Sequence, residues 1–238
     1  MGFFNRMGKA IVGIHRFLAE HAFYALALAT LLALACFAGR LYLSGRWEYL
    51  FLVWNLFLAW IPYLASLWGS MIRRLTPENP WLLMVPSALW LLFFPNAPYL
   101  VTDFIHIRHI DTFPWWFDLG LLALFAWSGC FLAVASLQAM QQIVRGLFGS
   151  VISWLFVLVA SGLCGFGIYL GRFLRWNSWD LFFNPRPLLA DIAAFLLDPR
   201  SHPQMIGVTG LFAAFVFVCY VTFLSSRAGQ PLGLDADC

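Results

Sequence analysis

The feature that most constrains this chain is a series of long apolar runs separated by short polar segments. Hydrophobic residues make up 62% of the 238 positions and charged residues only 11%, whereas soluble domains average about 45–50% apolar and about 25% charged residues. A water-soluble fold could not cover so much apolar surface with so few charges. A transmembrane helix needs roughly 20 apolar residues. The sequence therefore predicts an all-α, polytopic membrane helical bundle of about six transmembrane helices with short interfacial helices.

The expected spans lie at residues 22–43, 49–72, 81–95, 117–140, 147–170 and 205–224. The third is short, and two prolines that flank Asn96 should break it near 95–98. Residues 1–20 alternate apolar and basic side chains, which is typical of an amphipathic helix on a membrane surface. Residues 187–198 are too short to span and are expected to form another interfacial helix. The predicted organisation is a basic interfacial segment 1–20, a six-span domain 21–225 and a polar tail 226–238.

Basic residues bear on the orientation of the chain. Six spans put both termini on one side, and Lys and Arg then divide seven to seven between the two sides. The basic N-terminal segment and the Arg73-Arg74 pair favour a cytoplasmic N-terminus, because the first helix usually dominates orientation. We expect a multi-pass protein of the bacterial cytoplasmic (inner) membrane with both termini in the cytoplasm. The net charge is only +3 and no basic stripe is present, which excludes a nucleic-acid partner.

Polar residues concentrate after the predicted break in the third helix, between Asn96 and His109. If a short helix restarts near Pro98, then Tyr99, Asp103 and His106 lie at i, i+4 and i+7 on one face, with His109 on an adjoining stripe. Ionisable groups at membrane depth indicate a functional site by default. The alternative is an ordinary loop in the headgroup layer.

These residue types suggest roles. A carboxylate and an imidazole one turn apart can orient each other, so Asp103 and His106 are candidate catalytic residues. Asn96 and Tyr99 are candidate substrate contacts. The D-x-x-H spacing is too weak a pattern to predict a metal site, and the sequence names no cofactor and does not decide whether the protein is an enzyme.

A second polar cluster follows the fifth span. Arg172 and Arg175 would share a face with Trp179 if the helix continued past the bilayer, and two arginines one turn apart suit phosphate or carboxylate. Arg172, Arg175 and Asp180 are therefore candidate substrate-binding residues. The alternative is an interfacial helix end in which arginines snorkel to headgroups. The two clusters lie on the same side, so they form either one site or a set of structural Arg–Asp pairs.

Two further patterns concern helix packing. Asn55 is a polar exception inside the second span and is expected to hydrogen-bond between helices. Gly167 and Gly171 have the Gly-x-x-x-Gly spacing that lets helix backbones approach closely. In a multispan chain this spacing favours internal packing over a dimer face.

Three segments carry a family resemblance: Trp54 to Pro62, Trp90 to Asp103 with its Pro-Asn-Ala-Pro-Tyr run, and Gly167 to Asp180. At these residues the chain resembles an uncharacterised bacterial integral membrane family, a domain of unknown function numbered thirteen sixty-one. The resemblance covers roughly residues 30–225. It implies a multispan membrane protein and no activity, cofactor or catalytic residue.

Three functions remain open. The first is binding, or acting on, a lipid or lipid-linked phosphate at one membrane face, which the paired arginines and the Asp103/His106 face suggest. The second is an accessory subunit of a membrane protein complex, which the short loops and aromatic surface suit. The third is a small transporter or channel whose pathway follows the broken helix. Membrane lipids and other membrane protein subunits are the expected partners.

Overall fold

The structure is a computed structural model, and it describes residues 2–107 and 114–228. Within these residues the chain is helical, with no strand. The elements in chain order are α1 (Gly2–Glu20), α2 (Phe23–Ser44), α3 (Leu50–Leu75), η1 (Pro80–Leu83), α4 (Met84–Phe93), α5 (Asn96–Tyr99), η2 (Leu100–His106), α6 (Trp115–Phe148), α7 (Ser150–Phe173), α8 (Asp180–Phe183), α9 (Pro185–Leu197), η3 (Pro199–Ser201) and α10 (Pro203–Ala228).

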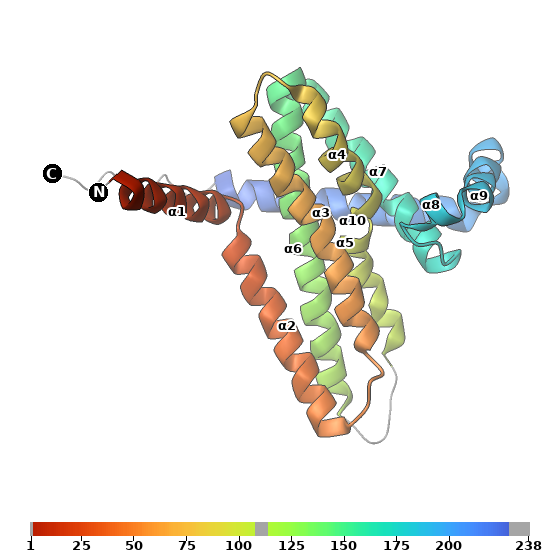
Figure 1. Cartoon of the computed structure of the whole chain (residues 1–238). Helices are drawn as coiled ribbons and strands as arrows, with labels where there is room; N and C mark the ends of the chain where they lie inside the picture. The colour runs from red at the N-terminus through yellow and green to blue at the C-terminus, as the bar shows by residue number, and fades with distance from the viewer. Residues whose placement is uncertain (1, 108–113, 229–238) are drawn as a thin grey trace.

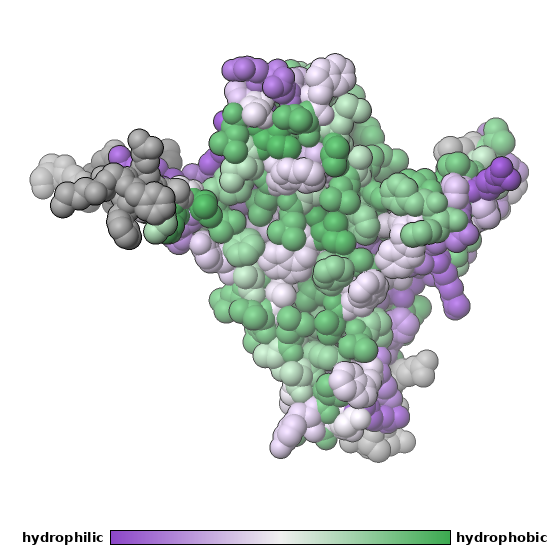
Figure 2. All heavy atoms as spheres, viewed as in Figure 1, coloured by the Kyte–Doolittle hydropathy of each residue, from purple (hydrophilic) through white to green (hydrophobic). Residues whose placement is uncertain are grey.

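Six helical segments in the described part of the chain are long and apolar enough to cross a membrane, so the expected bundle is confirmed. They cover 23–44, 50–75, 80–106, 115–148, 150–173 and 203–226. Helices are favoured because backbone groups in lipid must find their partners within the segment. In Figure 2 apolar residues cover the middle of the molecule and hydrophilic residues gather near its ends and at its edges. The chain is an integral, multi-pass membrane protein.

The bundle is built around α6, which at 34 residues is the longest helix described. α2, α3 and the α4–α5–η2 segment run along α6, and α7 tilts away from this direction (Figure 1). α10 runs across the bundle and packs mainly on α7. α8 and α9 lie to one side of the bundle, beyond the end of α7 (Figure 1). The polar tail expected at 226–238 overlaps the end of α10, and residues 229–238 lie outside the described part.

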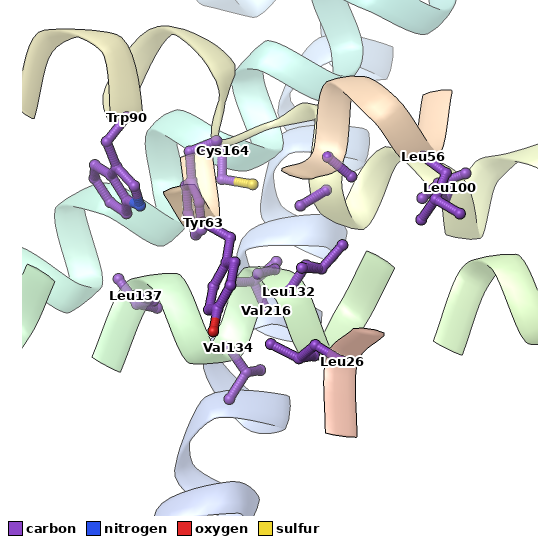
Figure 3. Close-up of a cluster of buried hydrophobic side chains, with 14 of the residues drawn as sticks. Leu26, Leu56, Tyr63, Trp90, Leu100, Leu132, Val134, Leu137, Cys164 and Val216 are labelled. Atoms are coloured by element: carbon purple, nitrogen blue, oxygen red, sulfur yellow. The ribbon is translucent and has the colours of Figure 1, made fainter. Parts of the chain in front are cut away.

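The core collects side chains from nearly every span. Figure 3 shows Tyr63 of α3, Trp90 of α4, Leu137 of α6 and Cys164 of α7 converging, with Val216 of α10 nearby. All five are at most 2% exposed. Because lipid is as apolar as these side chains, their contribution comes from close packing rather than from removal from water.

The third span differs from the expected one. The backbone keeps helical angles through the proline, with φ −60° and ψ −26° at Pro95, so the helix is interrupted without being turned aside. Pro95 lacks an amide hydrogen, and the intrahelical ladder restarts at Asn96. The span therefore runs from Pro80 to His106 instead of ending at residue 95. Asp103 and His106 belong to its last turns and not to a connecting loop.

Glycines allow neighbouring helices to approach this interrupted segment. A Cβ at Gly129 of α6 would lie 2.3 Å from the Ala97 carbonyl oxygen, and one at Gly167 of α7 would lie 2.4 Å from Pro95 Cγ. A Cβ at Gly171 would lie 3.3 Å from the Tyr99 ring. The Gly-x-x-x-Gly pair thus faces the third span of the same chain, which confirms the predicted internal packing.

Candidate functional site

A buried ion pair joins the two clusters that the sequence singled out. Arg172 Nη2, at the end of α7, donates to Asp103 Oδ1 of η2 at 2.5 Å. The Asp103 side chain is 1% exposed and that of Arg172 is 15% exposed. A charged pair at this depth is stabilised only when its remaining hydrogen-bonding groups are also satisfied.

Neighbouring side chains supply those bonds. Asn55 Nδ2 of α3 donates to Asp103 Oδ2 at 2.9 Å, which confirms the expected interhelical bond of Asn55. Arg172 Nε donates to Thr102 Oγ1 at 2.9 Å, and Arg172 Nη1 lies 3.1 Å from His106 Nε2. The guanidinium carbon lies 4.6 Å from the centre of the Tyr99 ring, within cation–π range. The network ties α3, the third span and α7 together.

The predicted fork of two arginines does not form. α7 ends at Phe173, and Arg175 takes a left-handed conformation with φ 61°. Arg175 is therefore turned away from the helical position that would align it with Arg172, and its side chain is exposed. The helix ends here because the backbone amide of Trp176 returns to the carbonyl of Leu170, a bond that closes the last turn.

Asp180 also lies apart from the ion pair. Its carboxylate accepts the backbone amide hydrogen of Asn177 at 2.7 Å and bonds to the side-chain amides of Asn177 and Asn184. The backbone hydrogen bond from Asn177, aided by the two amides, lowers the pKa of Asp180 below its usual value. Asp180 thus shapes the turn between α7 and α8 and is 9% exposed.

Asn96 connects the interrupted helix to this turn. Asn96 Nδ2 donates to Ser178 Oγ at 3.0 Å and to the Phe93 carbonyl at 3.1 Å. Ser178 Oγ donates in turn to the Leu92 carbonyl at 3.0 Å. Sequence reasoning missed Ser178, although the Asn-Ser-Trp-Asp run signals a turn that needs side-chain partners.

A pocket of about 580 Å³ opens beside the ion pair. Apolar side chains form its walls, among them Leu58, Leu91, Leu163, Phe166, Leu188 and Ile192. Its polar lining residues, Asn55, Asn96, Tyr99, Asn177 and Ser178, adjoin the turn that follows α7, and this part of the lining is called the polar end: Asn96 bonds to Ser178, Trp54, next to Asn55, packs on Trp179, and the Tyr99 ring lies beside Gly171. Three tryptophans, Trp54, Trp176 and Trp179, also line it. A hydrogen bond of 2.9 Å from Trp176 Nε1 to Asp191 Oδ2 holds α9 against this side.

The rim of the pocket lies on the outer faces of the spans. Leu91 of α4 is 44% exposed, Leu163 of α7 is 47% exposed and Trp54 of α3 is 53% exposed. The pocket is therefore open at the outer surface of the helix bundle. The arrangement combines apolar walls, a polar end and a lateral opening, which suits an amphiphile.

A second buried charge cluster was not foreseen. Arg40 of α2, which is 1% exposed, donates to Asp118 of α6 at 2.9 Å and to Glu48 at 3.1 Å. The Tyr49 hydroxyl donates to Asp118 Oδ2 at 3.2 Å. Arg40 and Asp118 each lie about one turn inside a helix end. This shared depth was the signal in the sequence from which the pair could have been predicted. The cluster fastens α2 to the beginning of α6.

Among the residues that the structure describes, no three His, Cys, Asp or Glu side chains converge as metal ligands would. His109, expected on a stripe beside His106, lies outside the described residues. The structure thus brings together Asp103, His106, Arg172 and Tyr99, and it joins Asn96 to the same pocket. Arg175 and Asp180 remain apart from them.

The model of a family described as "Protein of unknown function (DUF1361)" matches residues 54–219. All three segments that carried the resemblance lie within this range. No curated protein and no solved structure matches the chain. Because the match covers well over half of the 238 residues, the chain belongs to the DUF1361 family of proteins of unknown function.

Proposed function

We propose that this protein binds a membrane lipid or lipid-linked molecule in the pocket beside Asp103 and Arg172. The observation that carries the proposal is the amphipathic lining: apolar walls from α3, α4, α7 and α9 end in a group of amide and hydroxyl side chains. A lipid meets both requirements at once, because its chain fills the apolar part and its headgroup reaches the polar end.

The ion pair serves this pocket by positioning its polar end. Asn55 lines the pocket while its amide donates to Asp103, and Tyr99 lines it while its ring lies against Arg172. Because the ion pair already fixes these two side chains, they lose less conformational entropy when a ligand binds. Asp103 and Arg172 are thus positioning residues in this proposal, and the earlier catalytic hypothesis for Asp103 and His106 stays a prediction.

We further propose that both ends of the chain face the cytoplasm of a bacterial inner membrane. Arg73 donates to the carbonyl of Gly146, so the basic ends of α3 and α6 adjoin. Arg74 pairs with Glu20 of α1, which brings the basic amphipathic helix to the same end. A basic N-terminal segment beside the Arg73-Arg74 pair favours a cytoplasmic location for this end, because the first helix usually dominates orientation.

The test is lipid retention by a variant with a filled pocket. Leu163→Trp adds bulk to the pocket wall from an exposed position on α7, so the variant is expected to fold and to lose the retained lipid. Leu158→Trp is the matched control, because Leu158 lies on the same helix, is 53% exposed and does not line the pocket. Native mass spectrometry in a mild detergent measures the lipid bound to each.

Equal lipid retention by Leu163→Trp and the wild type would overturn the proposal. A stoichiometric partner protein, found in place of lipid, would instead favour the accessory-subunit hypothesis. Neither outcome depends on knowing the lipid beforehand.

A further inference from the structure

The polar end of the pocket presents hydrogen-bond acceptors. The hydrogen bonds around this end determine which side-chain atoms these acceptors are. Asn55 donates from Nδ2 to the Asp103 carboxylate, and Asn96 donates from Nδ2 to the Phe93 carbonyl. A carboxylate and a carbonyl only accept hydrogen bonds, so in each amide the nitrogen must face that partner. The oxygens Oδ1 of Asn55 and Asn96 accept no hydrogen bond from any described residue, and both residues line the pocket.

The same end offers donors as well. Tyr99 and Trp179 line the pocket, and the Tyr99 hydroxyl and the Trp179 indole N–H make no hydrogen bond within the described part of the chain. Among the lining residues that the structure describes, none is charged. The polar end is therefore neutral, and its side-chain groups without a hydrogen bond to a described residue include the amide oxygens of Asn55, Asn96 and Asn177, the Tyr99 hydroxyl and the indole N–H groups of Trp54 and Trp179.

A phosphate group fits this end poorly. It would meet the amide oxygens of this end, and the nearby guanidinium of Arg172 is already bonded to Asp103, Thr102 and His106. Arg175 does not line the pocket. An ammonium group fits no better, because no lining carboxylate would offset its loss of water. Burying a charge without a partner costs far more than burying a neutral group that forms hydrogen bonds.

We propose that the bound lipid carries an uncharged, hydroxyl-bearing headgroup of the sugar or glycerol class. Its hydroxyls donate to Oδ1 of Asn55 and Asn96 and accept from the Tyr99 hydroxyl and the Trp179 indole. The faces of the tryptophans at this end offer flat apolar surfaces for the C–H groups of a sugar ring. This inference rests on the proposed lipid-binding function and names its headgroup.

The experiment is a competition among three lipids that share dioleoyl chains and differ only in the headgroup. Delipidated protein in a mild detergent receives equal amounts of monoglucosyl diacylglycerol, phosphatidic acid and phosphatidylethanolamine, and native mass spectrometry measures the occupancy of each. The glucosyl lipid should exceed either phospholipid about 25-fold, because two neutral hydrogen bonds are each worth about fivefold and their factors multiply.

Tyr99→Phe tests the headgroup contact without disturbing the fold. It removes one hydroxyl that has no partner among the described residues and keeps the ring that lies against Arg172. The glucosyl preference should fall about fivefold. Tyr42→Phe is the matched control, since Tyr42 is 88% exposed and does not line the pocket.

The outcomes separate the inference from the function on which it rests. A preference for phosphatidic acid or phosphatidylethanolamine would overturn the headgroup assignment, and so would a glucosyl preference that Tyr99→Phe leaves unchanged. In those cases lipid binding that Leu163→Trp abolishes would still support the proposed function. If the wild type retained none of the three lipids, the proposed function and the inference would both fail.

Discussion

At the scale of single residues, the buried pair of Asp103 and Arg172 dominates the site. An ion pair in a low-dielectric interior contributes little net stability compared with apolar side chains, but removal of one partner leaves an uncompensated charge. Because the Arg172 guanidinium is bonded to Thr102, His106 and Asp103, it cannot easily reorient towards a different partner.

Asp103→Asn should therefore destabilise the protein by about 3 kcal/mol, since the amide keeps the shape of the carboxylate but not its charge. Chemical denaturation in detergent micelles, followed by tryptophan fluorescence, measures the change. Arg175→Ala is the control, and an exposed side chain of this kind should change stability by no more than about 0.5 kcal/mol. Equal stability of Asp103→Asn and the wild type would show that the pair contributes nothing.

Sequence reasoning reached some of these residues and not others. The spacing of Tyr99, Asp103 and His106 predicted one helical face, and η2 extends to His106. The prediction that Arg175 shares a helical face with Arg172 was wrong, because the helix ends before Arg175. The end of a helix depends on which carbonyl the next backbone amide reaches. Asp118 was overlooked because its partner, Arg40, lies 78 positions away in the chain, and no local pattern reports a contact at that separation.

At the scale of elements, the turn between α7 and α8 closes the polar end of the pocket. Asn177, Ser178 and Trp179 come from this turn, and Asp180 holds it through the amide hydrogen of Asn177. The spans themselves were predictable from hydropathy to within a few residues at most ends. The third was the largest exception, since a proline stops the hydrogen-bond ladder without necessarily changing the backbone angles. The fourth was the other, because α6 continues to Phe148, beyond the expected end at residue 140.

The stability that Asp180 confers should depend on pH. Its pKa in the folded protein is lowered by the Asn177 amide hydrogen, so the stabilisation is present above the unfolded value of about 4 and is lost as the pH falls through the lower folded value. The wild type should exceed Asp180→Asn in thermal stability at pH 7, and the difference should shrink towards pH 3. A difference in thermal stability that stays constant over this pH range would contradict the prediction that the ionised carboxylate of Asp180 stabilises the protein.

At the scale of the whole molecule, the two ends of the bundle differ in character. The exposed apolar side chains Met7, Ile11 and Ile14 of α1 share one helical face, and α1 meets the bundle at the end of α3. The opposite end carries the Arg40 cluster and the start of α6. The number of spans followed from the pattern of apolar runs, but the crosswise course of α10 and the pocket did not, because both depend on which helix faces meet.

The orientation can be measured by cysteine labelling. In a background without native cysteines, Glu78→Cys follows α3 at one end and Arg46→Cys follows α2 at the other. A membrane-impermeant maleimide applied to intact spheroplasts should label Arg46→Cys and spare Glu78→Cys, since the basic end is expected in the cytoplasm. The reverse pattern would place both ends of the chain outside, and equal labelling would contradict the span assignment.

The partnership of Arg40 with Asp118 bears on how the protein is assembled. During synthesis α2 enters the membrane before Asp118 has been made, and a central arginine costs about 2.5–3.5 kcal/mol on insertion. Arg40 lies near one end of α2, where its side chain can stay near the interface until α6 arrives. Glu48 follows α2 directly in the chain and can pair with Arg40 first, and the bond from Arg40 to Asp118 joins α2 to α6 once the fourth span has been inserted.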